Sequence, residues 1–166
     1  MKKAVSMILM CLLIITVCVG CGNQMAEKKQ TTTIANPWSD WDSIEEAESK
    51  VGFSFGLPER IADSYDAVNI RTMNTELIEV VYLYEDFEVC VRKQKGEGQD
   101  ISGDYNKYDT FTETSQNGGT VINYHNATNN AVKQIVSYKG YSWSLAAPNG
   151  YWGDSNADFL RIIWEQ

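Results

Sequence analysis

The chain has 166 residues and carries 14 Lys and Arg against 22 Asp and Glu, which gives a formal net charge of −8. This acidic balance opposes binding to nucleic acid, and we expect no nucleic-acid partner. Three of the four cysteines lie within the first 21 residues. We therefore expect a packed core, rather than a disulfide framework, to stabilise the fold.

The first residues are typical of a secretory signal peptide. Lys2 and Lys3 precede an apolar run over residues 4–19, AVSMILMCLLIITVCV. As a helix this run would span about 24 Å, which is shorter than the ~30 Å hydrocarbon core of a bilayer. The run is therefore better explained as the apolar region of a cleaved signal than as a membrane-spanning helix.

The run ends in Cys18-Val19-Gly20-Cys21, which resembles the lipobox of bacterial lipoproteins. The resemblance implies that the thiol of Cys21 receives a diacylglyceryl group and that cleavage leaves Cys21 as the new N-terminus. Cys18 departs from the pattern, which usually has Leu there. The alternative is an ordinary signal peptide cut nearby, with Cys21 left free.

Lipidation would place the mature protein on the extracytoplasmic face of the bacterial cell membrane. Acyl chains contribute about 0.8 kcal/mol per buried methylene, and two chains suffice for a stable anchor. Cleavage would leave 12 basic against 22 acidic side chains, a net charge of −10, so the lipid rather than charge would hold the protein to the membrane. We expect a signal peptide over 1–20, a flexible tether over 21–35, and one globular domain over 36–166.

A short helix is predicted at the start of this domain. Asp42 or Ser43 can cap it, Ile44, Ala47 and Val51 form one apolar stripe, and Gly52 suits its end.

The next residues, Gly52-Phe53-Ser54-Phe55-Gly56, match the G-x-S-x-G motif of serine hydrolases. A nucleophile elbow needs a strand before the serine and a helix after it. Here a helix is predicted before Ser54, and Pro58 stops any helix after it. We therefore predict that the protein is not an enzyme. The enzyme alternative would need a cleft that joins Ser54 or Cys90 to His125.

The middle of the chain predicts antiparallel strands. Residues 77–84 and 87–93 form a hairpin that pairs Tyr84 with Phe87 and Glu79 with Arg92, and residues 131–138 and 141–147 form a second one. Further strands are expected over 67–73 and 120–125, and a helix near the end, capped by Asp154 or Ser155. The predicted fold is α+β: a curved antiparallel sheet of five to six strands, with an N-terminal and a C-terminal helix packed against it.

Three segments, NPWSDWDSIEEAESKVGFSFGLPE (36–59), SGDYNKYD (102–109) and YKGYSWSL (138–145), resemble uncharacterised lipoproteins of Gram-positive bacteria. The resemblance implies the fold class and a lipid-anchored location, and it implies no activity. A weaker similarity is to lipoprotein carriers, in which a curved, half-open barrel shelters an acyl chain.

No metal or cofactor is expected. Asp100, Ser102, Asp104 and Asn106 offer oxygens at alternate positions, but a calcium-binding EF-hand loop would need Gly and Glu where Tyr105 and Phe111 stand. We interpret the segment as an acidic surface loop. His125 lacks the partners that a metal site needs.

Aromatic residues beside Asp and Asn form the candidate binding surface: Trp38, Trp41, Tyr105, Tyr108, Tyr151 and Trp152. Exposed aromatics of this kind suit a glycan or a partner protein; the alternative is that they pack the helices onto the sheet. We predict a non-catalytic binding or protein-interaction domain for an envelope protein, a glycan or a small apolar ligand. The alternative is a carrier that holds a lipid or another apolar molecule in a cavity of the curved sheet.

Overall fold

A computed structural model describes residues 36–61, 65–85, 87–148 and 156–166. Residues Asn36–Gln166 form one compact unit. The predicted signal peptide, Cys21, the tether, the caps Asp154 and Ser155, and the candidate residues Tyr151 and Trp152 lie outside the described residues.

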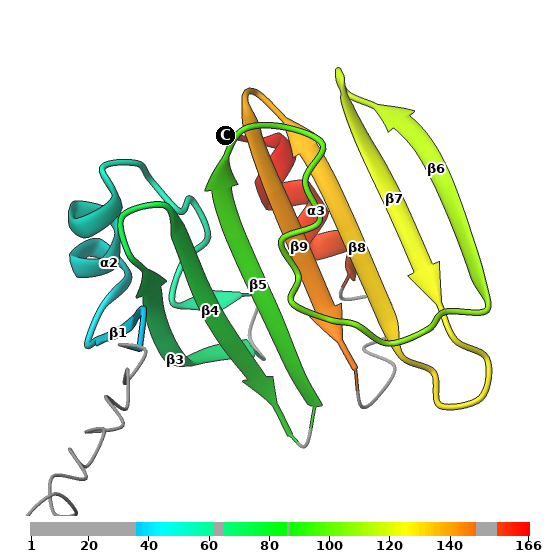
Figure 1. The fold of residues 1–166 in the computed structure, drawn as a ribbon, viewed down its shortest axis with the longest axis horizontal. Coiled ribbons are helices and arrows are strands. Elements are labelled where there is room, and N and C mark those ends of the chain that lie inside the picture. The colour runs from blue at the N-terminus through cyan, green and yellow to red at the C-terminus, as the bar shows by residue number, and fades with distance from the viewer. Residues whose placement is uncertain (1–35, 62–64, 86, 149–155) are drawn as a thin grey trace, which may run out of the picture. The chain divides into compact units, whose positions relative to one another are not determined.

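The fold is dominated by one antiparallel sheet of nine strands (Figure 1). Eight of them follow the order β1-β3-β4-β5-β9-β8-β7-β6, and β2 pairs with β3. The strands are β1 Trp38–Trp41, β2 Arg60–Ile61, β3 Tyr65–Met73, β4 Leu77–Tyr84, β5 Phe87–Lys95, β6 Thr110–Gln116, β7 Gly119–His125, β8 Val132–Tyr138 and β9 Tyr141–Ala147. The two helices in the described part of the chain are α2 Ile44–Val51 and α3 Asn156–Trp164.

The predicted α+β class is wrong. The described part of the chain holds nine strands rather than five to six, with two short helices, so the fold is mostly β. The additional strands are β1, β2 and β6. Strands β1 and β2 were not predicted because they are very short. Strand β6 (TFTETSQ) was not predicted because it is exposed at every position and has no alternation of apolar and polar residues.

Several local predictions are confirmed. Ser43 caps α2 by accepting a hydrogen bond from the Glu46 amide, and Gly52 ends the helix with a φ of 72°. The β4–β5 hairpin has the predicted register, with Tyr84 opposite Phe87. The β8–β9 hairpin also pairs as predicted, with Val136 opposite Trp143.

Side chains of neighbouring positions point to opposite faces of the sheet. On one face, which we call the helix face, the residues of β4, β5 and β9 pack against α2, α3 and the extended segment 53–57. Phe55 contacts Trp143, and Phe159 contacts Tyr82 edge-on, with 5.5 Å between ring centroids in both pairs. All four side chains are almost fully buried, so this face holds the core.

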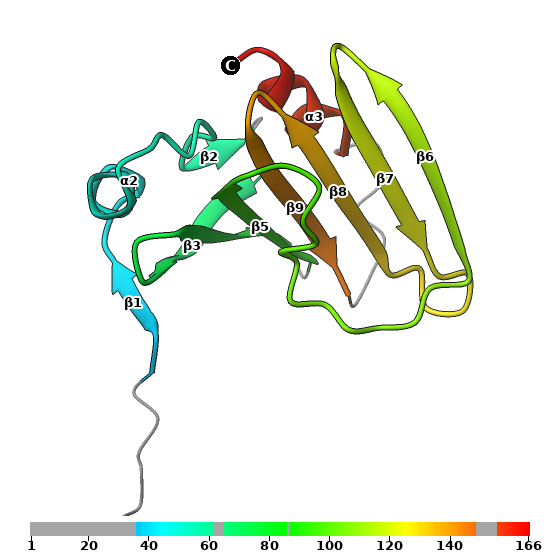
Figure 2. The same cartoon turned by 45° about the horizontal axis from the view of Figure 1, so that its top comes forward.

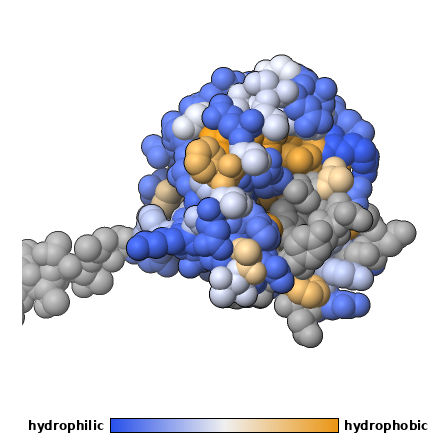
Figure 3. All heavy atoms as spheres, turned by 90° about the vertical axis from the view of Figure 1, so that its right-hand side faces the viewer, coloured by the Kyte–Doolittle hydropathy of each residue, from blue (hydrophilic) through white to orange (hydrophobic). Residues whose placement is uncertain are grey.

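The opposite face, which we call the loop face, lies under the loop over residues 96–109. This loop joins β5 to β6 and passes in front of β9 and β8, whereas α3 lies behind them (Figures 1 and 2). The strand β6 forms the edge of the sheet at the end of the strand order away from β1. Figure 3 looks onto that edge and shows mostly hydrophilic residues, with hydrophobic ones in small patches.

Candidate functional site

The loop face carries polar side chains where a second layer would normally need apolar ones. Arg92 of β5 lies directly opposite Ser144 of the neighbouring strand β9, and Lys133 of β8 lies directly opposite Tyr124 of the neighbouring strand β7. Lys133 and Ser144 are buried. The 96–109 loop passes in front of β8 and β9 (Figure 1) and bonds Lys133, and we take this region as the candidate site.

The loop is stiffened by its own side chains. The Asp100 carboxylate accepts hydrogen bonds from the Ser102 amide (3.0 Å) and hydroxyl (2.6 Å). The Ser102 hydroxyl accepts from the Asp104 amide (3.1 Å), and the Asp104 carboxylate accepts from the Asn106 amide (2.9 Å). The oxygens at alternate positions therefore satisfy the backbone two residues further on, which is a turn geometry.

These side-chain hydrogen bonds explain, without an ion, why oxygen-bearing side chains stand at alternate positions of the loop, as they do in a calcium-binding loop. Among the described residues, no three His, Cys, Asp or Glu side chains gather closely enough to hold a metal.

Side chains from the sheet fasten the same loop. Lys133 Nζ donates to Asp100 Oδ2 (2.9 Å) and to the Asp104 carbonyl (3.3 Å), and Arg92 donates to the Ile101 carbonyl (2.9 Å). Partial burial opposes ionisation of Asp100, but hydrogen bonds from Ser102 and Lys133 outweigh it and lower the pKa of this carboxyl. The loop is thus fastened to the sheet by charge-assisted hydrogen bonds.

Tyrosine rings enclose the Lys133 ammonium. Its Nζ lies 4.6 Å from the ring centroid of Tyr124 and 5.3 Å from that of Tyr108. The Tyr108 hydroxyl donates to Asp104, and burial together with this acceptor raises the Tyr108 pKa. Phe111 of β6 extends the group, with its centroid 6.1 Å from that of Tyr124.

We call Tyr105, Tyr108, Phe111 and Tyr124 the aromatic surface. Tyr105 is 95% exposed and Phe111 is 68% exposed, whereas Tyr108 and Tyr124 are half-buried. A shallow cleft of about 410 Å³ adjoins Tyr105. Its lining is formed by Cys90, Ser102, Gly103, Asp104, Tyr105, Asn106, Ala146 and Pro148.

The structure divides the aromatic residues that the sequence grouped together. Tyr105 and Tyr108 belong to the 96–109 loop, whereas Trp38 and Trp41 lie in β1, at the other end of the strand order. The indole of Trp41 donates to Thr72 Oγ1 (3.0 Å). The Trp38 ring lies 4.3 Å from the guanidinium of Arg71. Both tryptophans are half-buried and make contacts within the domain.

Arg71 and Arg92 share Glu79 on the loop face. Glu79 is only 1% exposed, and both guanidinium groups bond its carboxylate, Arg92 at 2.6 Å. Because each charge has an opposite partner, this buried group is a structural ion-pair network.

The residues of the enzyme alternative do not form a site. Ser54 Oγ donates to Glu48 Oε1 (3.0 Å), so its hydrogen-bond partner is a carboxylate and not an imidazole. His125 ends β7, opposite Val132 and Thr110. Burial, with a smaller contribution from Glu79, raises the Cys90 pKa to about 12, which opposes formation of a nucleophilic thiolate.

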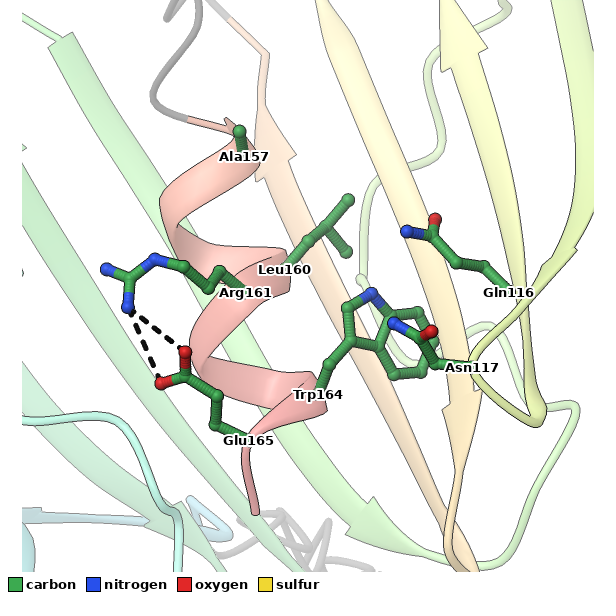
Figure 4. Close-up of a pocket in the computed structure, with 7 residues that line it drawn as sticks. All are labelled: Gln116, Asn117, Ala157, Leu160, Arg161, Trp164 and Glu165. Atoms are coloured by element: carbon green, nitrogen blue, oxygen red, sulfur yellow. Dashed lines mark hydrogen bonds and ion pairs between the residues drawn. The ribbon is translucent and has the colours of Figure 1, made fainter.

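A second cleft, of about 520 Å³, lies between α3 and the β6–β7 turn (Figure 4). Leu160 and Trp164 point from α3 toward Gln116 at the end of β6 and Asn117 of the turn, and Arg161 pairs with Glu165 on the outer side of the helix. The indole N–H of Trp164 is buried without a hydrogen-bond partner in the described structure.

Sequence reasoning missed Phe111, Tyr124 and Lys133 as members of the candidate site. Tyr124 and Lys133 could have been paired from a β7–β8 register, since both strands were predicted. Phe111 lies in β6, which carried no strand signal, so its position beside Tyr124 depends on pairing that only the structure shows.

No family model, curated protein or solved structure matches the chain. The resemblance to lipoproteins of Gram-positive bacteria therefore stays a prediction. Within the described ranges, no helix has the length and apolar character needed to cross a membrane.

Proposed function

We propose that residues 36–166 form a non-catalytic binding domain, held at the extracytoplasmic face of the membrane by lipid on Cys21. The domain recognises an envelope protein or a glycan through the aromatic surface. The observation that carries this proposal is the almost complete exposure of Tyr105 on a loop that the sheet and its own side chains hold in place.

Preorganisation is the physical reason for this choice. A tyrosine offers a large contact area, and a loop that is already ordered loses little further entropy when a partner binds. The neighbouring oxygens of Asp104 and Asn106 line the adjoining cleft, where they can accept hydrogen bonds from a partner at the rim of the contact.

The packing of the helix face supports a binding domain over the carrier alternative. A carrier needs a deep apolar cavity, but on this face Trp143, Tyr82 and Phe55 are almost fully buried against their neighbours. Polar or charged side chains line part of both clefts described above, and neither cleft is an enclosed apolar chamber.

Site-specific photo-crosslinking in living cells tests the proposal. A photoreactive amino acid is placed at Tyr105 and, as the matched control, at Val68, an exposed position (53%) on β3. We expect a discrete covalent adduct from position 105 and none from position 68. Equal labelling at both positions would contradict the proposal. An adduct of lipid mass alone would favour the carrier.

A further inference from the structure

The strand β6 is an open edge of the sheet. It is last in the strand order, and β7 is its one partner there. Its outward side therefore presents backbone N–H and C=O groups that no neighbouring strand of the sheet satisfies. Both faces of the strand are open as well, because all seven residues are exposed.

Edge strands in soluble proteins normally carry features that prevent another strand from pairing with them: short length, proline, charged side chains (lysine above all) or a bulge. In contrast, β6 has seven residues, contains neither proline nor lysine, and pairs with β7 in an unbroken register. The strand at the other end of the order, β1, has only four residues. Glu113 is the one charged residue of β6.

We propose that β6 receives an extended strand of a partner protein, which pairs antiparallel with it and places a lysine or arginine opposite Glu113. Backbone hydrogen bonds along an edge supply affinity for any extended chain, whereas side chains at alternate positions supply specificity. The partner is thus identified by one basic residue within a segment that favours an extended conformation.

The register defines the rest of the pattern. Phe111 and Glu113 lie on the loop face, because they pair with Tyr124 and Ile122 of β7. In an antiparallel strand, the residue two positions after the basic one lies opposite Phe111, where an aromatic side chain would pack. The residue between them lies opposite Thr112, and the residues on either side of the pair lie opposite Thr114 and Thr110 of the helix face. β-branched residues suit these three positions.

A second copy of this chain is a poor occupant. Antiparallel pairing of β6 with itself about a two-fold axis at its centre brings Glu113 opposite Glu113, and like charges directly opposite each other are destabilising. Each copy also carries a net charge of −8, which opposes association at low ionic strength. Charge complementarity therefore favours a basic segment of another protein.

This inference shares Phe111 with the aromatic surface, but its affinity comes from the backbone of β6. Tyr105 lies in the loop and not on the β6 edge, so Tyr105→Ala separates the two proposals. The test uses the full chain, labelled with ¹⁵N in detergent micelles, and the synthetic peptide Thr-Ser-Thr-Lys-Thr-Phe-Thr. One control peptide has Glu in place of Lys. A second control carries N-methyl groups on alternate backbone nitrogens, which remove the donors that pair with an edge.

We expect chemical-shift changes confined to β6 and β7, at least tenfold tighter binding of the Lys peptide than of the Glu peptide, and no binding of the N-methylated peptide. Glu113→Lys should reverse the preference, and Tyr105→Ala should leave it unchanged.

Four results would overturn the proposal. They are no shift at millimolar Lys peptide, equal binding of the N-methylated peptide, loss of binding in Tyr105→Ala, or a wild-type chain that dimerises through β6, which chemical shifts of β6 that change with protein concentration would show.

Discussion

Lys133 Nζ lies 2.9 Å from Asp100 Oδ2, and this ion pair joins the loop that carries Tyr105 to strand β8. The lysine end is buried, whereas the aspartate side chain is 45% exposed. The pair therefore connects the interior of the sheet to the surface that we propose binds a partner. Its strength should control how well ordered the loop is.

Replacement of Asp100 by Asn should loosen the loop without unfolding the domain. We expect the free energy of unfolding to fall by about 1 kcal/mol, since the amide keeps one acceptor but loses the charge. Backbone hydrogen exchange should accelerate over residues 102–106. Asp40→Asn, at an exposed position in β1, is the control. Unchanged exchange in the Asp100 variant would contradict the role of the ion pair.

The same pair predicts a dependence on acid. A carboxyl whose pKa is lower in the folded state than in the unfolded state stabilises the fold above the unfolded value, near 3.9, and this contribution is lost as the pH falls through the folded value. Wild type should therefore lose more stability than Asp100→Asn below pH 4, in thermal melts from pH 6 to pH 2.5. Parallel losses in both proteins would show that Asp100 is not the group responsible.

Removal of the charge on Glu79 should have a much larger effect. Glu79→Gln would remove the buried carboxylate that Arg71 (33% exposed) and Arg92 (16% exposed) share. Breaking a buried pair in this way typically costs about 3–5 kcal/mol. Urea unfolding should show this loss. The control is Glu88→Gln, at an exposed glutamate of β5 that also lies on the loop face, and it should change the free energy of unfolding by less than about 0.5 kcal/mol. Equal effects would contradict the network.

Local pairing was predictable because a strong signal lay within a short stretch of sequence. Two apolar runs separated by two residues fixed the β4–β5 register, and the opposite charges of Glu79 and Arg92 supported it. The position of α2 followed from its cap and its apolar stripe. Such signals depend on neighbouring residues, so one sequence is enough to read them.

The size of the sheet and most of the candidate site were not predictable in this way. Strand β6 buries no side chain, so hydrogen bonds to β7 rather than an apolar pattern define it. The contact of Lys133 with Asp100 joins residues 33 positions apart. Neither residue type nor spacing indicates that a lysine will be buried between two tyrosines, because this depends on which loop covers which strands.

Cys90 should be unreactive in the native protein. A rise in its pKa to about 12, caused by burial and by Glu79, lowers the thiolate fraction about a thousandfold relative to an ordinary thiol. Iodoacetamide labelling at pH 8, measured by mass spectrometry of the peptide that contains Cys90, should be at least a hundredfold slower in buffer than in 8 M urea. Comparable rates would mean that the thiol is accessible and ionised.

Lys93 offers a pH test of the helix face. Its ammonium donates to the Ser54 carbonyl (2.7 Å) and to Gln166 Oε1 (3.0 Å) and lies 4.3 Å from the Trp143 ring centroid. Burial nevertheless lowers its pKa to about 8, with Glu48 opposing the shift. The folded state therefore releases this proton before the unfolded state does, whose lysine pKa is near 10.4.

A base with a lowered pKa destabilises the fold most below that pKa, and the penalty disappears as the pH rises toward the unfolded value. The difference in unfolding free energy between wild type and Lys93→Met should consequently shift in favour of wild type from pH 7.5 to pH 9.5, by no more than about 1.4 kcal/mol per pH unit. Urea unfolding at four pH values measures it. Lys50→Met, at an exposed position in α2, should show a constant difference. If the Lys93→Met difference is also constant, the ammonium is stabilised by its carbonyl and aromatic contacts as fully as it would be by water.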